Sequence, residues 1–191
     1  LTIRKTLFLV FTLPFIAYVG FLTYENNENF KLRIDDTLSS INSINNGSFK
    51  SNTNVSSYAL MSNLFVAKSN FTDHPLGSGL GSHVYMHKHF YLKKMTPPKY
   101  IKILKLQDIN ASDANSLFLR LFSELGIFGV VLVFFILYKY SSCFRYDDLI
   151  IAQGIFIYLI LKLIRDGHYF SPEIFFFIWL LYYSLKDKKS I

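Results

Sequence analysis

The chain has 191 residues, of which 51% are hydrophobic and 18% aromatic, and its formal net charge is +7. Its single cysteine, Cys143, excludes an intramolecular disulfide and a thiolate metal cluster. A basic composition fits either nucleic acid or an anionic membrane surface. The apolar residues occur in long blocks, however, which favours a membrane protein over a soluble nucleic-acid-binding domain.

The first element is an apolar run from Thr6 to Tyr24 that contains no charged residue. Arg4 and Lys5 precede it, as in a signal peptide, but no small-residue cleavage site follows. We therefore predict that residues 1–24 form a retained transmembrane helix, with a signal peptide as the alternative. The chain begins with Leu1 rather than Met, which suggests a non-standard start or a fragment.

Residues 25–112 form the second segment, whose composition changes along its length. Ser and Asn dominate residues 39–57, which favours turns or local disorder. Apolar residues recur at helical spacing in 58–71, which predicts an amphipathic helix on the membrane or on other helices. Residues 74–107 contain lysines and histidines but no acid, and Pro97-Pro98 divides them.

The third segment, residues 113–191, is predicted to hold an amphipathic helix followed by three transmembrane helices. The stretches without charge are Leu125–Tyr138, Leu149–Leu161 and Ile174–Leu185. The first becomes long enough to span a bilayer if Leu117–Glu124 leads into it, because a span needs about 20 residues. A buried helical hairpin is the alternative for the other two. Ser171-Pro172-Glu173 has the residues of a helix start: an N-cap, a first-turn proline and an acid.

The distribution of charge predicts one topology. With the N-terminus inside, four crossings place Lys139, Arg145 and the lysines of the C-terminal tail on the same side as Arg4 and Lys5. Residues 25–112 then lie outside, because long loops cross largely regardless of their charge. The expected fold is therefore an all-α integral membrane protein with about four transmembrane helices and one large periplasmic loop containing short amphipathic helices.

A glycine-rich cluster runs from Asp73 to His83, with Gly77, Gly79 and Gly81 at alternating positions. Such spacing lets successive backbone N–H groups form a concavity that binds an anion. The cluster is not a GxGxxG nucleotide fingerprint. A tight loop between two helices is the alternative.

A second cluster combines Asp113-Ala114-Asn115-Ser116 with an amphipathic stripe that ends at Gly126 and Gly129. Arg120 and Glu124 lie four residues apart on this stripe. They either pair across one helical turn or serve a polar cavity near the membrane. The two glycines would let another helix approach closely.

The run Asp113–Gly129 resembles the C-terminal signature of the O-antigen polymerase and ligase superfamily, in which a polar pair precedes an amphipathic helix and a Glu-Leu-Gly-x-x-Gly entry into the next span. His74–Gly81 looks like the glycine loop of that family, and Ser56–Leu60 is also similar to its polymerases. Arg165–Tyr169 matches a polar outer turn between the last two helices. The resemblance covers the chain from about Ser56 onward.

Two departures from the family pattern bear on function. Ligases carry a histidine where this chain has Asn115, and asparagine cannot act as a general base at neutral pH. This difference favours a polymerase over a ligase. Family members also have many more membrane helices, which we expect to lie before Leu1. The remaining hypothesis is a non-catalytic, truncated membrane protein of the same gene cluster.

The resemblance implies transfer of a glycan from undecaprenyl diphosphate to an acceptor sugar hydroxyl, without a nucleotide sugar, metal or other cofactor. Guanidinium groups would stabilise the diphosphate leaving group, and Arg120 and Arg165 are the candidates. The alternatives are that Arg120 only pairs with Glu124 on the helix surface and that Arg165 only anchors the helix at the membrane interface.

The resemblance leaves several other site residues open. The candidates for the general base are His74, His83, His168 and Glu124, and Asn115 belongs to the polar pair. The substrate-binding candidates are His74, Gly77, Gly79, Gly81 and His83. His83 and His87 have zinc-like spacing, but no acid or cysteine lies near them in the sequence, so no metal site is expected. Expected partners are an undecaprenyl diphosphate-linked oligosaccharide, membrane lipids and a chain-length regulator, with no nucleic acid, in the bacterial inner membrane.

Overall fold

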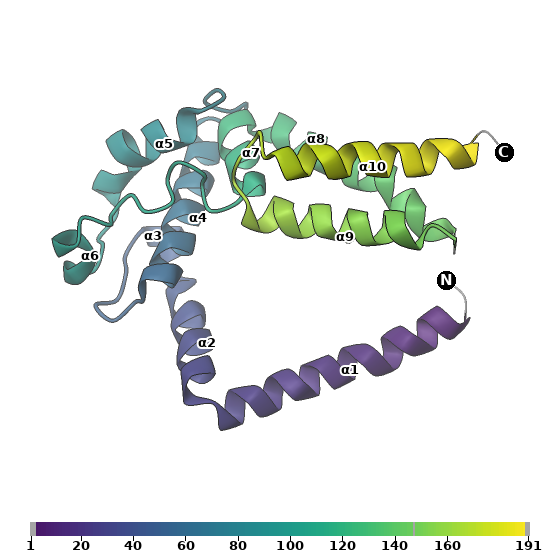
Figure 1. Ribbon diagram of the computed structural model, residues 1–191. Coiled ribbons are helices and arrows are strands. Elements are labelled where there is room, and N and C mark those ends of the chain that lie inside the picture. The colour runs from purple at the N-terminus through teal and green to yellow at the C-terminus, as the bar shows by residue number, and fades with distance from the viewer. Residues whose placement is uncertain (1–2, 147, 190–191) are drawn as a thin grey trace.

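The computed structural model describes residues 3–146 and 148–189, with side chains from Val10 to Lys186 except Asp147. The fold is all-α, as predicted, and these residues contain no β-strand. One isolated parallel bridge joins Ser48 to Thr96. Figure 1 shows three parts: the arm α1, a head built from α2 to α7, and a bundle of α8, α9 and α10.

The arm α1 spans Ile3–Asn26 and contains the predicted first span, part of which lies outside the described side chains. Asn27 caps the next helix, α2 (Glu28–Ser40), by accepting a 3.0 Å hydrogen bond from the N–H of Phe30. The two helices meet at a steep angle, so α1 runs back toward the end of the molecule that holds the C-terminal end of α10 (Figure 1).

The head surrounds a central helix, α4 (Val55–Asp73). Its other elements are α3 (Ser43–Asn46), α5 (Ser82–Met86), the π-helical turn η1 (His87–Tyr91), the 3-10 turn η2 (Leu92–Lys94), α6 (Lys99–Ile103) and α7 (Leu117–Leu125). The Ser- and Asn-rich segment before α4 forms turns and the short α3, and Asn54 caps α4 through a 2.9 Å hydrogen bond from the N–H of Ser57.

The helix predicted at 58–71 is confirmed, but it is not simply amphipathic. Buried residues lie on most sides of α4, and they include the polar side chains of Ser62, Asn63 and Asn70. The reason is that α2, α3, α5 and α7 all pack around this helix. Buried polar groups require partners, so Asn63 and Asn70 mark the inner network described below.

The amphipathic helix that begins at Leu117 does not continue into the apolar stretch that follows it. Gly126 separates α7 from α8 (Ile127–Tyr140), with a positive φ of 58°. A Cβ atom there would collide with the carbonyl oxygen of Pro75, and that oxygen instead accepts a 2.9 Å hydrogen bond from the N–H of Ile127. The apolar helix α8 is lengthened at its C-terminal end instead, where the 3-10 turn η3 (Ser141–Arg145) continues it.

The bundle places α9 (Ile150–Arg165) and α10 (Pro172–Lys189) beside α8 (Figure 1). Their shared core contains Cys143, Ala152, Phe156 and Leu181. As predicted, α10 begins at Pro172. The backbone carbonyl of Ser171 accepts a 3.1 Å hydrogen bond from the N–H of Ile174.

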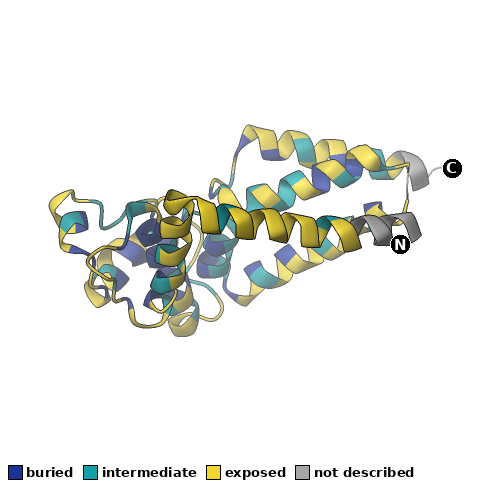
Figure 2. Ribbon diagram, turned by 90° about the horizontal axis from the view of Figure 1, so that it is seen from below, coloured by how far each residue is buried: buried dark blue, intermediate teal, exposed yellow. Residues whose placement is uncertain are grey.

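The head differs from α1 and the bundle in how far its residues are buried. Figure 2 shows buried segments concentrated in the head, whereas α1 and the outer faces of the bundle are mostly exposed. These faces carry large apolar side chains, including Phe11, Phe134, Ile151 and Trp179. Within the described residues, one continuous helix of 19 residues, Ile127–Arg145, has the length and apolar composition needed to cross a membrane.

Candidate functional site

The carboxylate of Glu124 is the centre of the polar network at the junction of head and bundle. Its side chain is only 1% exposed. Oε2 accepts hydrogen bonds from the N–H of Gly81 at 2.7 Å and from the hydroxyl of Tyr169 at 2.5 Å. Oε1 accepts them from the N–H of His83 at 3.2 Å and from Nε of Arg120 at 3.1 Å. Glu124 therefore joins three segments that are distant in the sequence.

The glycine loop, residues 74–82, wraps around this residue. The N–H of Gly79 donates a 3.0 Å hydrogen bond to the backbone carbonyl of Glu124. Gly77 has a φ of +95°, and a Cβ atom there would collide with the same carbonyl. Of the three glycine N–H groups, only that of Gly81 donates to the carboxylate of Glu124. Those of Gly77 and Gly79 donate to the backbone carbonyls of His74 and Glu124, so all three are satisfied within the protein. The loop lies between α4 and α5, and it holds the end of α7.

Arg120 is held on three sides. Besides its ion pair with Glu124, its Nη1 donates a 3.0 Å hydrogen bond to the carbonyl of Gly167. Its Cζ lies 4.2 Å from the ring centroid of Tyr169, in a cation–π arrangement. These contacts fix the guanidinium group in position. A guanidinium group carries more N–H donors than these contacts occupy.

A cleft of about 440 Å³ opens beside Arg120 and is lined by Arg120, His168, Tyr169, Phe170, Ser171 and Pro172. Phe170 is 82% exposed at this cleft, and His168 is also exposed. The guanidinium donors can bind oxygen atoms of a phosphate or a sugar. An exposed aromatic ring provides an apolar surface for the face of a sugar. The cleft therefore has the groups needed to bind an oxygen-rich, anionic ligand.

The segment leading into α7, residues 113–117, packs at the side of the cleft against the end of α9 and the turn that follows it, residues 163–167. The N–H of Leu117 donates a 2.9 Å hydrogen bond to the carbonyl of Asp166, and Oγ of Ser116 donates to the carbonyl of Leu163 at 3.1 Å. A Cβ atom on Gly167 would collide with the carbonyl of Asp113, so glycine is needed for this approach. Hydrogen bonds from the N–H of His168 and from Lys162 lower the pKa of Asp166.

His83 continues the network into the head. Its Nε2 lies 3.1 Å from Oδ1 of Asn63, whose amide nitrogen donates 2.8 Å and 3.2 Å hydrogen bonds to the carbonyls of Ala59 and Ile109. Burial, together with the nearby charges of His87 and Arg120, lowers the pKa of His83 to about 3. A neutral, buried imidazole with this contact is a structural group rather than an accessible base.

The predicted site residues fall into two groups. Arg120, Glu124, Gly77, Gly79, Gly81 and His83 meet in one network, and His168 lies at the cleft beside it. The side chains of three others, His74, Arg165 and Asn115, lie outside that network.

His74 is exposed at the C-terminal end of α4. Arg165 is exposed at the end of α9, where it forms no ion pair within the described part of the chain. Asn115 adopts a positive φ of 60° and accepts a 2.8 Å hydrogen bond from the amide of Asn110, as part of a turn.

The sequence did not point to Tyr169, Phe170, Asn63 or Asn70 as members of this region. The amide nitrogen of Asn70 lies 2.8 Å from the carbonyl of Ser123 and 2.7 Å from Oγ of Ser78, which ties the glycine loop to α7. Two asparagines on the same predicted helix as its apolar residues were the available signal, because buried amides require partners. Among the described residues, no group of three or more His, Cys, Asp or Glu side chains could hold a metal ion.

Comparison with known proteins gives no match among family models, curated proteins or solved structures. The fold and the site thus define an all-helical protein with a polar network and a cleft at one end of an apolar helix bundle.

Proposed function

We propose that the chain is the C-terminal part of an O-antigen or capsular repeat-unit polymerase in the bacterial inner membrane. It would have four spans, α1, α8, α9 and α10, with the head in the periplasm. It would transfer glycan from undecaprenyl diphosphate to an acceptor sugar hydroxyl at the cleft beside Arg120.

The exposed apolar faces of α1 and the bundle support the membrane part of the proposal. Large apolar side chains such as Phe15, Phe21, Phe135 and Phe176 are exposed there. Contiguous apolar surface of this kind is unfavourable in water and marks contact with lipid or protein. The bundle and α1 extend from the head toward the same end of the molecule, as helices crossing one bilayer would (Figure 1).

One observation carries the enzymatic part: three segments that resemble the family meet at one place. The glycine loop, the Asp113–Gly129 run and the Arg165–Tyr169 turn are joined by Glu124 and Arg120. Contacts between segments far apart in the sequence are not a consequence of helix propensity. They support a shared role for these segments in shaping one site.

In this proposal, Arg120 stabilises the negative charge that develops on the departing diphosphate. Glu124, the glycine loop and Tyr169 hold the guanidinium in place, so little reorganisation is needed during the reaction. His168 is the candidate general base that lines the cleft, and we assign it the proton of the acceptor hydroxyl. Glu124 acts as a positioning residue because both of its carboxylate oxygens already have partners. His83 acts as a positioning residue because its ring is buried away from the cleft.

Ligation of a finished glycan to lipid A core is the second candidate function. At the position where ligases carry a histidine, this chain has Asn115, which lies in a tight turn and is hydrogen-bonded to Asn110. Because asparagine cannot act as a general base, this position disfavours the ligase. A third hypothesis is a non-catalytic protein of the same gene cluster.

Deletion of the full gene tests the three hypotheses. A strain without a polymerase should make glycolipid that carries single repeats in place of a ladder. An unchanged ladder would refute the proposal. Polymer accumulating on undecaprenyl diphosphate would indicate the ligase instead.

Complementation of the deletion strain then tests the site. We expect Arg120→Gln and His168→Ala each to abolish the ladder. His168 is exposed, so its loss should not affect folding, which can be checked from the amount of protein in the membrane. Arg33→Gln is the matched control, because Arg33 is exposed on α2, away from the cleft. A normal ladder in each of the two single variants, Arg120→Gln and His168→Ala, would refute the assignment of the site.

A further inference from the structure

A second pocket lies at the opposite end of the bundle from Arg120. It has a volume of about 560 Å³ and is formed by the C-terminal ends of α8 and α10 together with η3. Lys139, Arg145 and Lys186 are among its lining residues, together with Tyr140 and Tyr182. None of these residues takes part in the network around Glu124.

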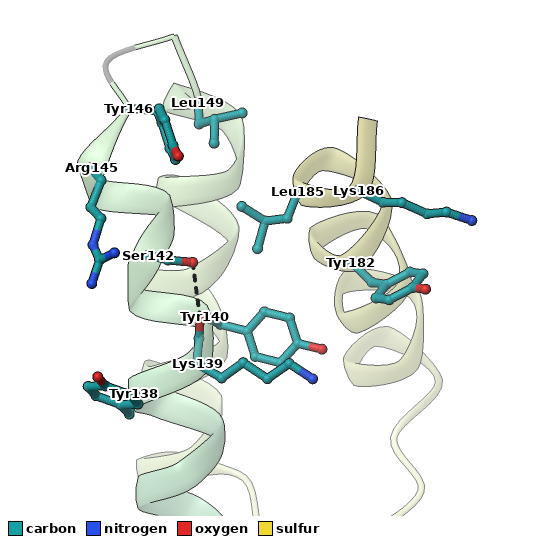
Figure 3. Close-up of a pocket in the computed structure, with 10 residues that line it drawn as sticks. All are labelled: Tyr138, Lys139, Tyr140, Ser142, Arg145, Tyr146, Leu149, Tyr182, Leu185 and Lys186. Carbon is teal, nitrogen blue, oxygen red and sulfur yellow. Dashed lines mark hydrogen bonds between the residues drawn. The ribbon is translucent and has the colours of Figure 1, made fainter. Parts of the chain in front are cut away.

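The side chains of this pocket differ in direction (Figure 3). Lys139 and Tyr140 extend from α8 toward α10, and Tyr182 lies on the facing helix, whereas Arg145 and Lys186 extend outward on either side. Nζ of Lys139 lies 5.6 Å from the ring centroid of Tyr140. Ser142 closes the end of α8 by donating a 3.0 Å hydrogen bond to the carbonyl of Lys139. Lys139 is thus the cation that faces the space between the helices.

An apolar groove begins where this pocket ends. The groove has a volume of about 320 Å³ and shares Lys139 and Tyr140 with the pocket. Its other lining residues are all apolar and come from α7, α8, α9 and α10, for example Leu132, Phe135 and Ile178. A cationic, tyrosine-rich mouth therefore continues into a hydrocarbon-like surface along the bundle.

We infer that this pocket and groove bind an anionic phospholipid, with its phosphate beside Lys139 and an acyl chain along the groove. The inference rests on the membrane part of the proposed function but not on the transferase activity. Basic pockets between helices on the cytoplasmic side of a membrane are suited to anionic headgroups, and tyrosine favours the interface. Because Asp147, Asp148 and Asp187 occur nearby in the sequence, we expect a moderate electrostatic attraction between the pocket and the anionic headgroup.

The test measures lipid binding by the full 191-residue chain in detergent, using native mass spectrometry and titration with dioleoyl phosphatidylglycerol or dioleoyl phosphatidylcholine. We expect phosphatidylglycerol to bind more tightly, and Lys139→Ala to weaken its binding about fivefold. The matched control is Lys93→Ala, which removes an exposed lysine from the head and should leave binding unchanged. Equal binding of the two lipids, or equal effects of the two substitutions, would overturn the inference.

Two further measurements examine the ligand. Dihexanoyl phosphatidylglycerol should bind more weakly than the dioleoyl lipid, and equal affinities would refute the role of the groove. Undecaprenyl phosphate that displaces phosphatidylglycerol at lower concentration would overturn the assignment to a phospholipid, as would displacement by inorganic phosphate alone. The lipid-binding assay contains no glycan donor and measures no transfer. A negative result in it is therefore distinguishable from failure of the proposed glycan transfer.

Discussion

The hydroxyl of Tyr169 donates a 2.5 Å hydrogen bond to Oε2 of Glu124, from the loop between α9 and α10 to the buried end of α7. The ring of the same tyrosine lies against the guanidinium of Arg120. Burial and the neighbouring carboxylate raise the pKa of the Tyr169 hydroxyl, so it remains a donor at physiological pH. One side chain thus couples the bundle to the head.

Tyr169→Phe should remove this hydrogen bond and keep the ring. Because hydrogen bonds to charged groups are stronger than average, we expect a loss of about 2 kcal/mol in the free energy of unfolding. Chemical unfolding in detergent would measure it. Tyr138→Phe, at an exposed tyrosine of α8, is the control and should have little effect. Similar stability of the two variants would show that the hydroxyl contact does not hold the parts together.

Gly77→Ala should destabilise the protein by about 3 kcal/mol or more, because it combines an unfavourable positive φ with a collision against the carbonyl of Glu124. Gly154→Ala provides the contrast. Gly154 lies inside α9 with open space around its Cα, so alanine should stabilise the helix by about 0.5–1 kcal/mol. Thermal unfolding of the two variants would compare them. A mild effect at Gly77 would contradict the tight packing of the loop.

The sequence allowed the helices to be predicted more readily than the site. The stretch Leu149–Leu161 lies in α9 except for its N-cap residue Leu149, and Ile174–Leu185 lies within α10, because local apolar composition determines where such helices form. The break at Gly126 was not predicted, since it depends on a contact with Pro75 in another segment.

The same distinction applies to the polar residues. Spacing along a helix suggested that Arg120 and Glu124 could pair, and the 3.1 Å ion pair is present. Local spacing could not indicate that the glycine loop binds Glu124, because tertiary packing brings them together. Tyr169 was overlooked for the same reason: its role depends on where the turn after α9 folds back.

The stability of the head should decrease in mild acid. Burial lowers the pKa of His87 to about 4 and that of His83 to about 3, compared with about 6.5 for an ordinary histidine. Below pH 7 the unfolded chain therefore binds protons that the folded chain does not, and the free energy of unfolding falls as the pH decreases. Between pH 7 and pH 5 the loss should be about 2 kcal/mol for each histidine.

His87→Leu tests this dependence. Both ring nitrogens of His87 are buried and have no hydrogen-bond partner among the described residues, so an apolar side chain should be tolerated. Unfolding measured at pH 7 and pH 5 should show a smaller difference in the variant than in the parent chain. His89→Leu, at an exposed histidine, should leave the difference unchanged. An undiminished pH dependence in His87→Leu would argue against a neutral, buried His87.

The four-span proposal predicts that the head and the turn η3 lie on opposite sides of the membrane. Ser51, in the head, and Ser141, at the end of α8, are both exposed and can each be replaced by cysteine. Cys143 is fully buried, and Cys143→Ala removes the only native thiol. In spheroplasts, a membrane-impermeant maleimide should label Ser51→Cys directly but should label Ser141→Cys only after lysis. Because α8 alone separates the head from Ser141, equal labelling of both positions before lysis would show that α8 does not cross the bilayer.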